Sequence, residues 1–100
     1  MDTSDLARIA RMERALNECT AATAALGAAL ERMDALRESM TALFCYYGSE
    51  DWDRDREASL PPGTAAGVLS EDAVYDVITS LRAEAFRMLE LATDILKNRI

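Results

Sequence analysis

The chain has 100 residues, of which 50% are apolar, 29% are charged and 6% are aromatic, with a net charge of −7. This length fits one domain, and the Ala-rich, charged composition is typical of long helices and not of a sheet. No segment of the chain is basic, and the one local row of cations, Arg8, Arg11 and Arg14, is typical of a solvated helix face. We therefore expect no nucleic-acid partner, because binding phosphates requires concentrated positive charge.

The N-terminal segment and the cysteines indicate a cytoplasmic protein. Asp2 and Asp5 make this segment acidic, unlike the basic start of a signal peptide. No apolar run approaches the ~18 residues that a membrane span requires, so we also expect no membrane partner. Cys19 and Cys45 lack metal-ligand spacing, and the chain has no histidine. We therefore expect two reduced thiols.

The first predicted helix covers residues 4–47, and its apolar residues follow a heptad repeat. With Ile9 at position a, positions a and d hold Ile9, Met12, Leu16, Cys19, Thr23, Leu26, Leu30, Met33, Arg37, Met40, Phe44 and Tyr47. Position g adds Ala15, Ala22, Ala29, Leu36 and Leu43. A stripe this wide is suited to a bundle in which each helix faces more than one neighbour. Thr3 and Ser4 are both suitable N-caps for this helix.

A connector over residues 48–69 separates this helix from the next. Gly48 favours the left-handed conformation that ends many helices. A structureless loop of this length is unusual in a compact domain. We therefore expect local order, with a short helical turn over residues 51–59 and a tight turn at residues 61–63, where the sequence is Pro-Pro-Gly.

The second predicted helix covers residues 70–98 and has a strong start signal. Ser70 is a good N-cap, and Glu71 and Asp72 follow it at the positive end of the helix dipole. The apolar stripe of this helix runs through Val74, Ile78, Leu81, Ala85, Met88, Ala92 and Ile95. Both helices therefore carry small residues seven positions apart, where two backbones can approach closely.

The connector and the start of the second helix carry a family resemblance. The residues concerned are the pair Tyr46-Tyr47, Trp52, Asp55, the run Gly67-Val68-Leu69-Ser70-Glu71-Asp72, and Tyr75. In these residues the chain resembles the small bacterial proteins grouped as domain of unknown function 4298, over roughly Ile9 to Lys97. The chain departs from that pattern at Arg56, where the resemblance implies an aromatic residue. The resemblance implies an all-helical fold and no established activity.

The aromatic connector has two interpretations. In the first, its aromatic side chains close the open end of a helical hairpin. In the second, they anchor a recognition patch beside acidic side chains. The residues of this candidate interaction patch are Tyr46, Tyr47, Trp52, Asp55, Glu71, Asp72 and Tyr75. An acidic patch favours a basic protein segment as partner.

Two metal hypotheses are weaker. Residues 51–55 alternate carboxylates as a calcium loop does, but Arg56 stands where such a loop needs Gly and Pro62 where it needs Glu. The acidic residues Glu31, Asp34, Glu84, Glu90 and Asp94 resemble the magnesium-binding sets of all-helical nucleotide pyrophosphohydrolases. Glu31 and Asp34 fall outside the apolar stripe, where carboxylates do not converge. We expect no catalytic residue, no metal and no cofactor; a small carboxylate-dependent metalloenzyme is the alternative.

The two helices together predict an all-α, long antiparallel helical hairpin. The first helix is roughly 65 Å long and the second roughly 45 Å, so part of the longer stripe has no intramolecular partner. We expect a two-fold homodimer in which the hairpins pack as an antiparallel four-helix arrangement. The alternative is a monomeric three-helix bundle with a break near Gly27. Functionally, we expect a non-enzymatic interaction or adaptor module with a protein partner of unknown identity.

Overall fold

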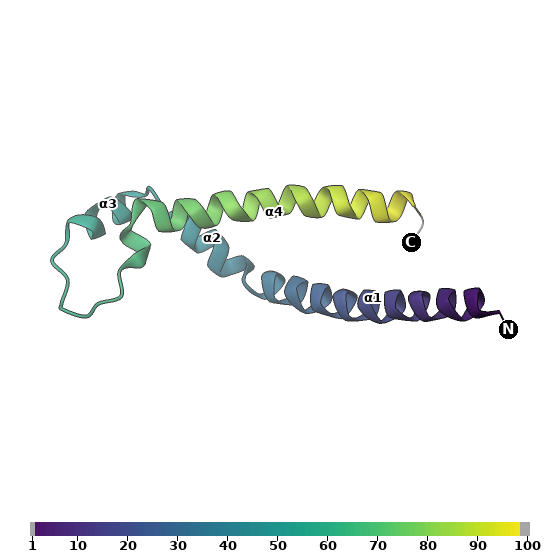
Figure 1. The fold of residues 1–100 in the computed structure, drawn as a ribbon. Coiled ribbons are helices and arrows are strands. Elements are labelled where there is room, and N and C mark those ends of the chain that lie inside the picture. Colours follow the sequence, from purple (N-terminus) through teal and green to yellow (C-terminus); the bar gives the residue numbers. More distant parts are fainter. Residues whose placement is uncertain (1, 99–100) are drawn as a thin grey trace. The chain divides into compact units, whose positions relative to one another are not determined.

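The computed structural model describes residues 2–98, and all the regular structure in that range is helical (Figure 1). The elements are α1 (Thr3–Ala35), α2 (Arg37–Tyr46), α3 (Glu50–Glu57), a short 3₁₀ helix η1 (Gly67–Leu69) and α4 (Glu71–Lys97). The all-α fold class is therefore confirmed. The chain divides into two compact units between Glu38 and Ser39.

The first unit is dominated by α1, which runs for 33 residues without interruption. Gly27 lies inside it, so the break that the three-helix alternative needs near this residue does not occur. The predicted N-caps Thr3 and Ser4 are wrong, because Asp2 occupies the cap position and makes no side-chain capping hydrogen bond. The first turn is instead stabilised by an ion pair between Asp5 and Arg8 at 2.9 Å.

A turn at Leu36 divides the helix expected over residues 4–47 into α1 and α2. The Leu36 amide is shared between the carbonyls of Arg32 and Met33 at 3.2 Å each, a bifurcated bond typical of helix ends. The Leu36 backbone has φ −95° and ψ 4°, outside the α-helical region. On the far side of the turn, Arg37 forms an ion pair with Asp34 at 2.7 Å. The one charge on the heptad stripe is thus paired within its own chain.

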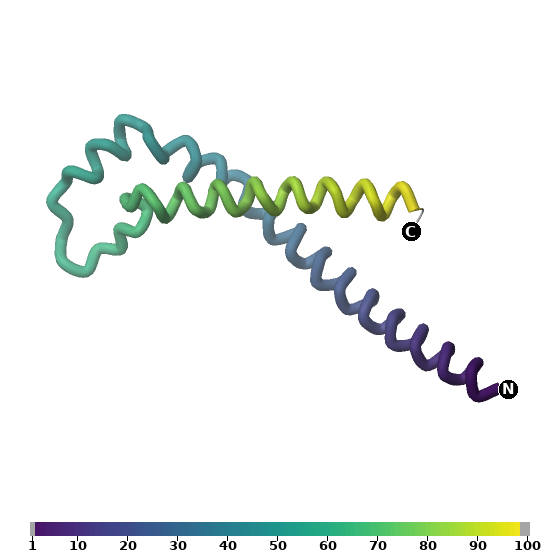
Figure 2. The backbone as a smooth tube through the Cα atoms, turned by 45° about the horizontal axis from the view of Figure 1, so that its top comes forward, coloured from purple at the N-terminus to yellow at the C-terminus, as the bar shows by residue number. Residues whose placement is uncertain are grey.

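The second unit begins in α2 and contains the connector and α4. Gly48 adopts φ 79° and ends α2 in the left-handed conformation, as predicted. The predicted helical turn over residues 51–59 is α3. Residues 58–66 form the loop between α3 and η1, which Figure 2 traces. Within it, Gly63 has φ 83°, and the Thr64 amide donates to the Pro61 carbonyl at 3.2 Å, which confirms the predicted Pro-Pro-Gly turn.

The predicted cap of the second helix is confirmed. The Ser70 backbone is extended, and its hydroxyl accepts a hydrogen bond from the Ala73 amide at 3.4 Å. Glu71 and Asp72 occupy the first turn of α4 and Lys97 the last, so both ends match the helix dipole.

Within residues 2–98, the buried side chains lie in the second unit. Among the residues described, Trp52 in α3 (6% exposed) and Val74 in α4 (4%) form the buried core, and α1 has no buried residue. None of the helices within residues 2–98 combines the length and the apolar character that crossing a bilayer requires.

Candidate interaction site

The connector is organised around the ring of Trp52. The indole Nε1–H donates to the backbone carbonyl of Val68 at 3.0 Å. Tyr47 packs edge-on against the indole, with ring centroids 4.9 Å apart and an interplanar angle of 63°. The guanidinium carbon of Arg56 lies 4.3 Å from the ring centroid, within cation–π range. These four residues, together with Glu71, are called the Trp52 cluster below.

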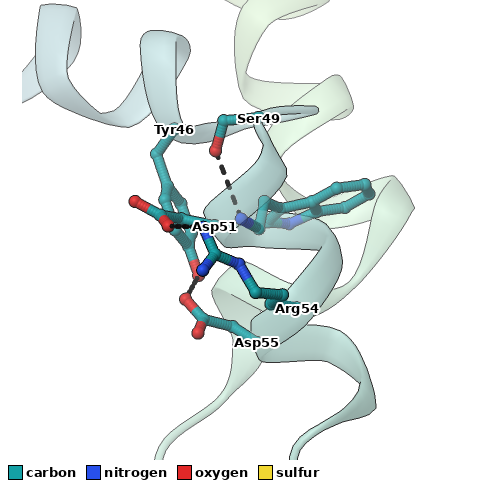
Figure 3. A network of polar contacts seen from close by, with 6 residues as sticks. Tyr46, Ser49, Asp51, Arg54 and Asp55 are labelled. Atoms are coloured by element: carbon teal, nitrogen blue, oxygen red, sulfur yellow. Dashed lines mark hydrogen bonds and ion pairs between the residues drawn. The ribbon is translucent and has the colours of Figure 1, made fainter.

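The position of Trp52 is fixed locally by the start of α3. Ser49 has an extended backbone and is the N-cap, and its hydroxyl accepts a hydrogen bond from the Trp52 amide at 3.2 Å (Figure 3). Asp51 and Arg54, one turn apart on the exposed side, form an ion pair at 2.7 Å. A helix of eight residues is marginal by itself. The cap and the packing of Trp52 therefore hold α3 in place together.

Two contacts tie the cluster to the start of α4. The Tyr47 hydroxyl donates to the backbone carbonyl of Glu71 at 3.1 Å. The Glu71 carboxylate lies 3.4 Å from Arg56. Both partners of Glu71 also contact the Trp52 ring, so the connector is a continuous network from the end of α2, through α3, to the first residue of α4.

A further side-chain hydrogen bond links the end of α2 to α3. The Tyr46 hydroxyl donates to the Asp55 carboxylate at 2.5 Å (Figure 3). This hydrogen bond, with desolvation and the negative charges of Asp55 and Asp51, raises the pKa of Tyr46 from its ordinary 10.0 to about 12. Ionising Tyr46 would remove its donor and place a second negative charge against Asp55. Tyr46 is therefore a neutral structural donor at neutral pH.

The structure places five of the seven predicted patch residues in two separate sets of contacts and leaves two outside them. Tyr47, Trp52 and Glu71 belong to the Trp52 cluster, and Tyr46 and Asp55 form the neighbouring pair. Within residues 2–98, no side-chain hydrogen bond or ion pair links Asp72 or Tyr75 to them. Tyr75 is 58% exposed on α4.

Sequence reasoning missed three contributors to this site: Ser49, Arg56 and the carbonyl of Val68. Arg56 had a usable signal, because it follows Trp52 by four residues and so lies on the same face of α3. It occupies the position where the family resemblance implies an aromatic residue, and its guanidinium lies over the indole. Ser49 also had a signal, because it precedes a run of acidic residues, as N-caps often do.

Three carboxylates at this site, two in the connector and one at the start of α4, have partners within the chain. Asp51 pairs with Arg54, Asp55 accepts from Tyr46, and Glu71 pairs with Arg56. In the part of the chain that the structure describes, no three metal-binding side chains come together as a possible ion site.

A second candidate surface lies on α1. We call it the α1 heptad face; it consists of Ile9, Met12, Leu16, Cys19, Thr23, Leu26, Leu30 and Met33. All eight residues are exposed, and the six larger apolar ones have exposed fractions between 37% and 60%. Contiguous apolar surface on this scale is uncommon on a soluble monomer and is typical of interaction sites.

One protein-family model matches the chain from α1, through the connector, into α4. The model of the family described as Domain of unknown function (DUF4298) matches residues 9–91. The chain belongs to this family. The match runs from the α1 heptad face through the Trp52 cluster into α4, so both candidate surfaces lie inside the DUF4298 region. Searches of curated proteins and of solved structures gave no match.

Proposed function

We propose that this DUF4298 protein is a non-enzymatic helical interaction module that acts as a homodimer. The observation that carries the proposal is the α1 heptad face: a helix of 33 residues has no buried residue, although its apolar side chains repeat every seven residues. A helix in a folded protein gains most of its stability from packing its apolar face. A partner helix is the surface that this face fits best.

In this proposal the connector has a structural role and holds α3 against the start of α4. The burial of Trp52 supports the first interpretation of the aromatic residues, in which they close the end of the fold. The exposed acidic side chains around it support a basic protein segment as a further partner, and they disfavour nucleic acid and anionic membranes. Cys19 and Cys45 are free thiols, which supports a cytoplasmic location.

Sedimentation equilibrium of the full chain tests self-association. We expect a species of twice the 11.0 kDa chain mass at micromolar concentration. Leu16→Gln places an amide on the α1 heptad face and should shift the dimer towards monomer. Ala21→Gln introduces the same side chain at position f, away from the face, and should leave the dimer intact. A monomeric parent chain, or equal effects of the two substitutions, would overturn the proposal.

The non-enzymatic part is tested with nucleoside triphosphates and magnesium, the substrates of the metalloenzyme alternative. We expect no release of phosphate or pyrophosphate above the background of the buffer. Hydrolysis that is lost on substituting both Glu84 and Asp94 with their amides would instead establish a carboxylate-dependent enzyme.

A further inference from the structure

The charges beside the α1 heptad face are few and asymmetrically placed. Positions e and g flank the seam of paired helices and set partner choice and orientation. Within α1 these positions carry three charges: Arg8 at g, and Glu13 and Asp34 at e. The other flanking residues are Leu6, Ala15, Thr20, Ala22, Gly27 and Ala29, which are small or uncharged. The three charges can therefore be used to compare the possible orientations of two α1 helices.

A parallel pair in register places opposite charges together. In that arrangement, position g of one helix faces position e of the following heptad on the other, five residues further along. Arg8 is then opposite Glu13 of the second copy, and two-fold symmetry makes this pair twice. The side chain of Arg8 is 60% exposed, and its one ion pair within residues 2–98 is the surface pair with Asp5, so it is available for this contact.

An antiparallel pair of α1 helices does not place opposite charges together. There, e faces e and g faces g across the seam. With the two helices fully overlapped, Glu13 approaches Asp34 or Gly27 of the second copy, and Arg8 approaches Ala29 or Leu36. Glu13 opposite Asp34 brings two acidic side chains together, and Arg8 opposite Ala29 or Leu36 has no acidic partner. The flanking charges thus favour the parallel orientation, in contrast to the usual antiparallel packing of helical hairpins.

The residues at positions a and d of the α1 heptad face, and the end of α1 at Leu36, are compatible with the parallel arrangement. In a parallel pair each layer brings identical residues together, so Thr23 meets Thr23 and Cys19 meets Cys19, two layers of small side chains between apolar ones. The residue that would oppose pairing is Arg37, which would face its own copy. The turn at Leu36 ends α1 before that layer, and Arg37 is paired with Asp34 instead.

We propose that two copies of the chain pair through the α1 heptad face in a parallel, in-register coiled coil, with Arg8 opposite Glu13 and the two Cys19 side chains facing each other. This inference rests on the proposed homodimer and specifies its surface and orientation.

A charge-exchange cycle tests the orientation. Arg8→Glu and Glu13→Arg, each alone, should raise the dimer dissociation constant about tenfold, because each creates two like-charge pairs. The double variant should recover the parent value to within about twofold. The two residues are five positions apart, so they do not contact each other within one helix. Arg14→Glu, at the outward position f, is the matched control and should change the constant little.

Disulfide trapping tests the register in a Cys45→Ser background. A disulfide needs Cα atoms within about 7 Å. Parallel pairing meets this limit at Cys19, whereas full antiparallel overlap places Cys19 opposite Thr23 and adds about 6 Å along the axis. Glutathione disulfide should therefore oxidise the two Cys19 thiols to one disulfide, releasing two glutathione thiols. The control Cys19→Ser with Ala21→Cys moves the thiol to position f and should give little covalent dimer.

The outcomes separate this inference from the proposed function. A dimer that forms the Cys19 disulfide and shows charge coupling supports both. A dimer that shows neither overturns the parallel coiled coil and leaves the homodimer standing. A monomeric parent chain overturns both.

Discussion

Trp52 and Val68 are joined by a hydrogen bond from the indole Nε1–H to the Val68 backbone carbonyl at 3.0 Å, across sixteen residues of sequence. Leaving a buried N–H without an acceptor costs about 1–3 kcal/mol. The burial of the indole therefore depends on where η1 places that carbonyl as well as on α3. Because η1 directly precedes the cap of α4, one hydrogen bond connects the order of the connector to the start of the last helix.

Trp52→Ala should destabilise the protein by about 3 kcal/mol or more, because it removes the largest buried side chain of the second unit. Trp52→Phe should destabilise less, because it keeps an aromatic ring in the core. Its remaining cost comes from the smaller ring and from the lost hydrogen bond to Val68. Urea unfolding followed by far-UV circular dichroism measures both. The control is Tyr75→Ala, at an exposed aromatic residue, which should change stability by no more than about 0.5 kcal/mol. Equal losses for Trp52→Ala and Tyr75→Ala would contradict the cluster.

Both serine N-caps, Ser49 and Ser70, should contribute measurably to the stability of the protein. Ser49→Ala and Ser70→Ala each remove the acceptor of a first-turn amide, and each should cost about 1 kcal/mol. Ser80→Ala is the matched control, because Ser80 lies inside α4, where alanine is the better helix former. Thermal unfolding of the three variants distinguishes the positions. A loss at Ser80 as large as that at either cap would count against the capping roles.

Arg56 should contribute more to the stability of the fold through its contact with the indole than through its ion pair with Glu71. The side chains of Arg56 and Glu71 are 37% and 67% exposed, so solvent screens their pair and limits it to about 0.5 kcal/mol. The contact with the Trp52 ring adds about 0.5–1 kcal/mol. We therefore expect Arg56→Gln to destabilise more than Glu71→Gln in denaturant titrations.

The neighbouring Arg54 provides the control for Arg56. Among the residues described, its polar partner is Asp51, in a surface pair with both side chains more than 70% exposed. Arg54→Gln should change stability by less than about 0.5 kcal/mol. If the Arg54 and Arg56 variants are equally stable, the packing of Arg56 on the indole does not contribute to the free energy of unfolding.

The parts of the fold that could be predicted from the sequence are those specified by adjacent residues. The cap at Ser70, the helix end at Gly48 and the turn at Gly63 each follow from the conformational preference of one residue and its immediate neighbours. The all-α class followed in the same way from composition and heptad spacing.

Other features could not be predicted because local sequence does not encode them. The turn at Leu36 contains no Gly or Pro, and its only sequence signal is a charge, Arg37, at an otherwise apolar heptad position. The acceptor for Trp52 is a backbone carbonyl, which carries no side-chain signature. Grouping the aromatic residues predicted the cluster, but it also included Tyr75, because sequence proximity does not show on which side of α4 a residue lies.

The hydrogen bond from Tyr46 to Asp55 predicts a loss of stability at high pH. The folded chain holds the Tyr46 proton up to a pKa of about 12, against 10.0 for an ordinary tyrosine. The folded state therefore binds this proton more tightly than the unfolded state does. The resulting stabilisation is complete below pH 10 and is lost as the pH rises from 10 to about 12. Urea unfolding across this range should show a steeper decline for the parent chain than for Tyr46→Phe.

Spectrophotometric titration of the phenolate absorbance checks the cause directly. Tyr46→Phe should remove the component of the titration near pH 12. Asp55→Asn keeps an acceptor oxygen but removes the negative charge, so it should move that component towards pH 10, because both the charge-assisted hydrogen bond and the repulsion of the phenolate are weakened. A parent titration that is unchanged by Asp55→Asn would show that Asp55 does not hold the Tyr46 proton in solution.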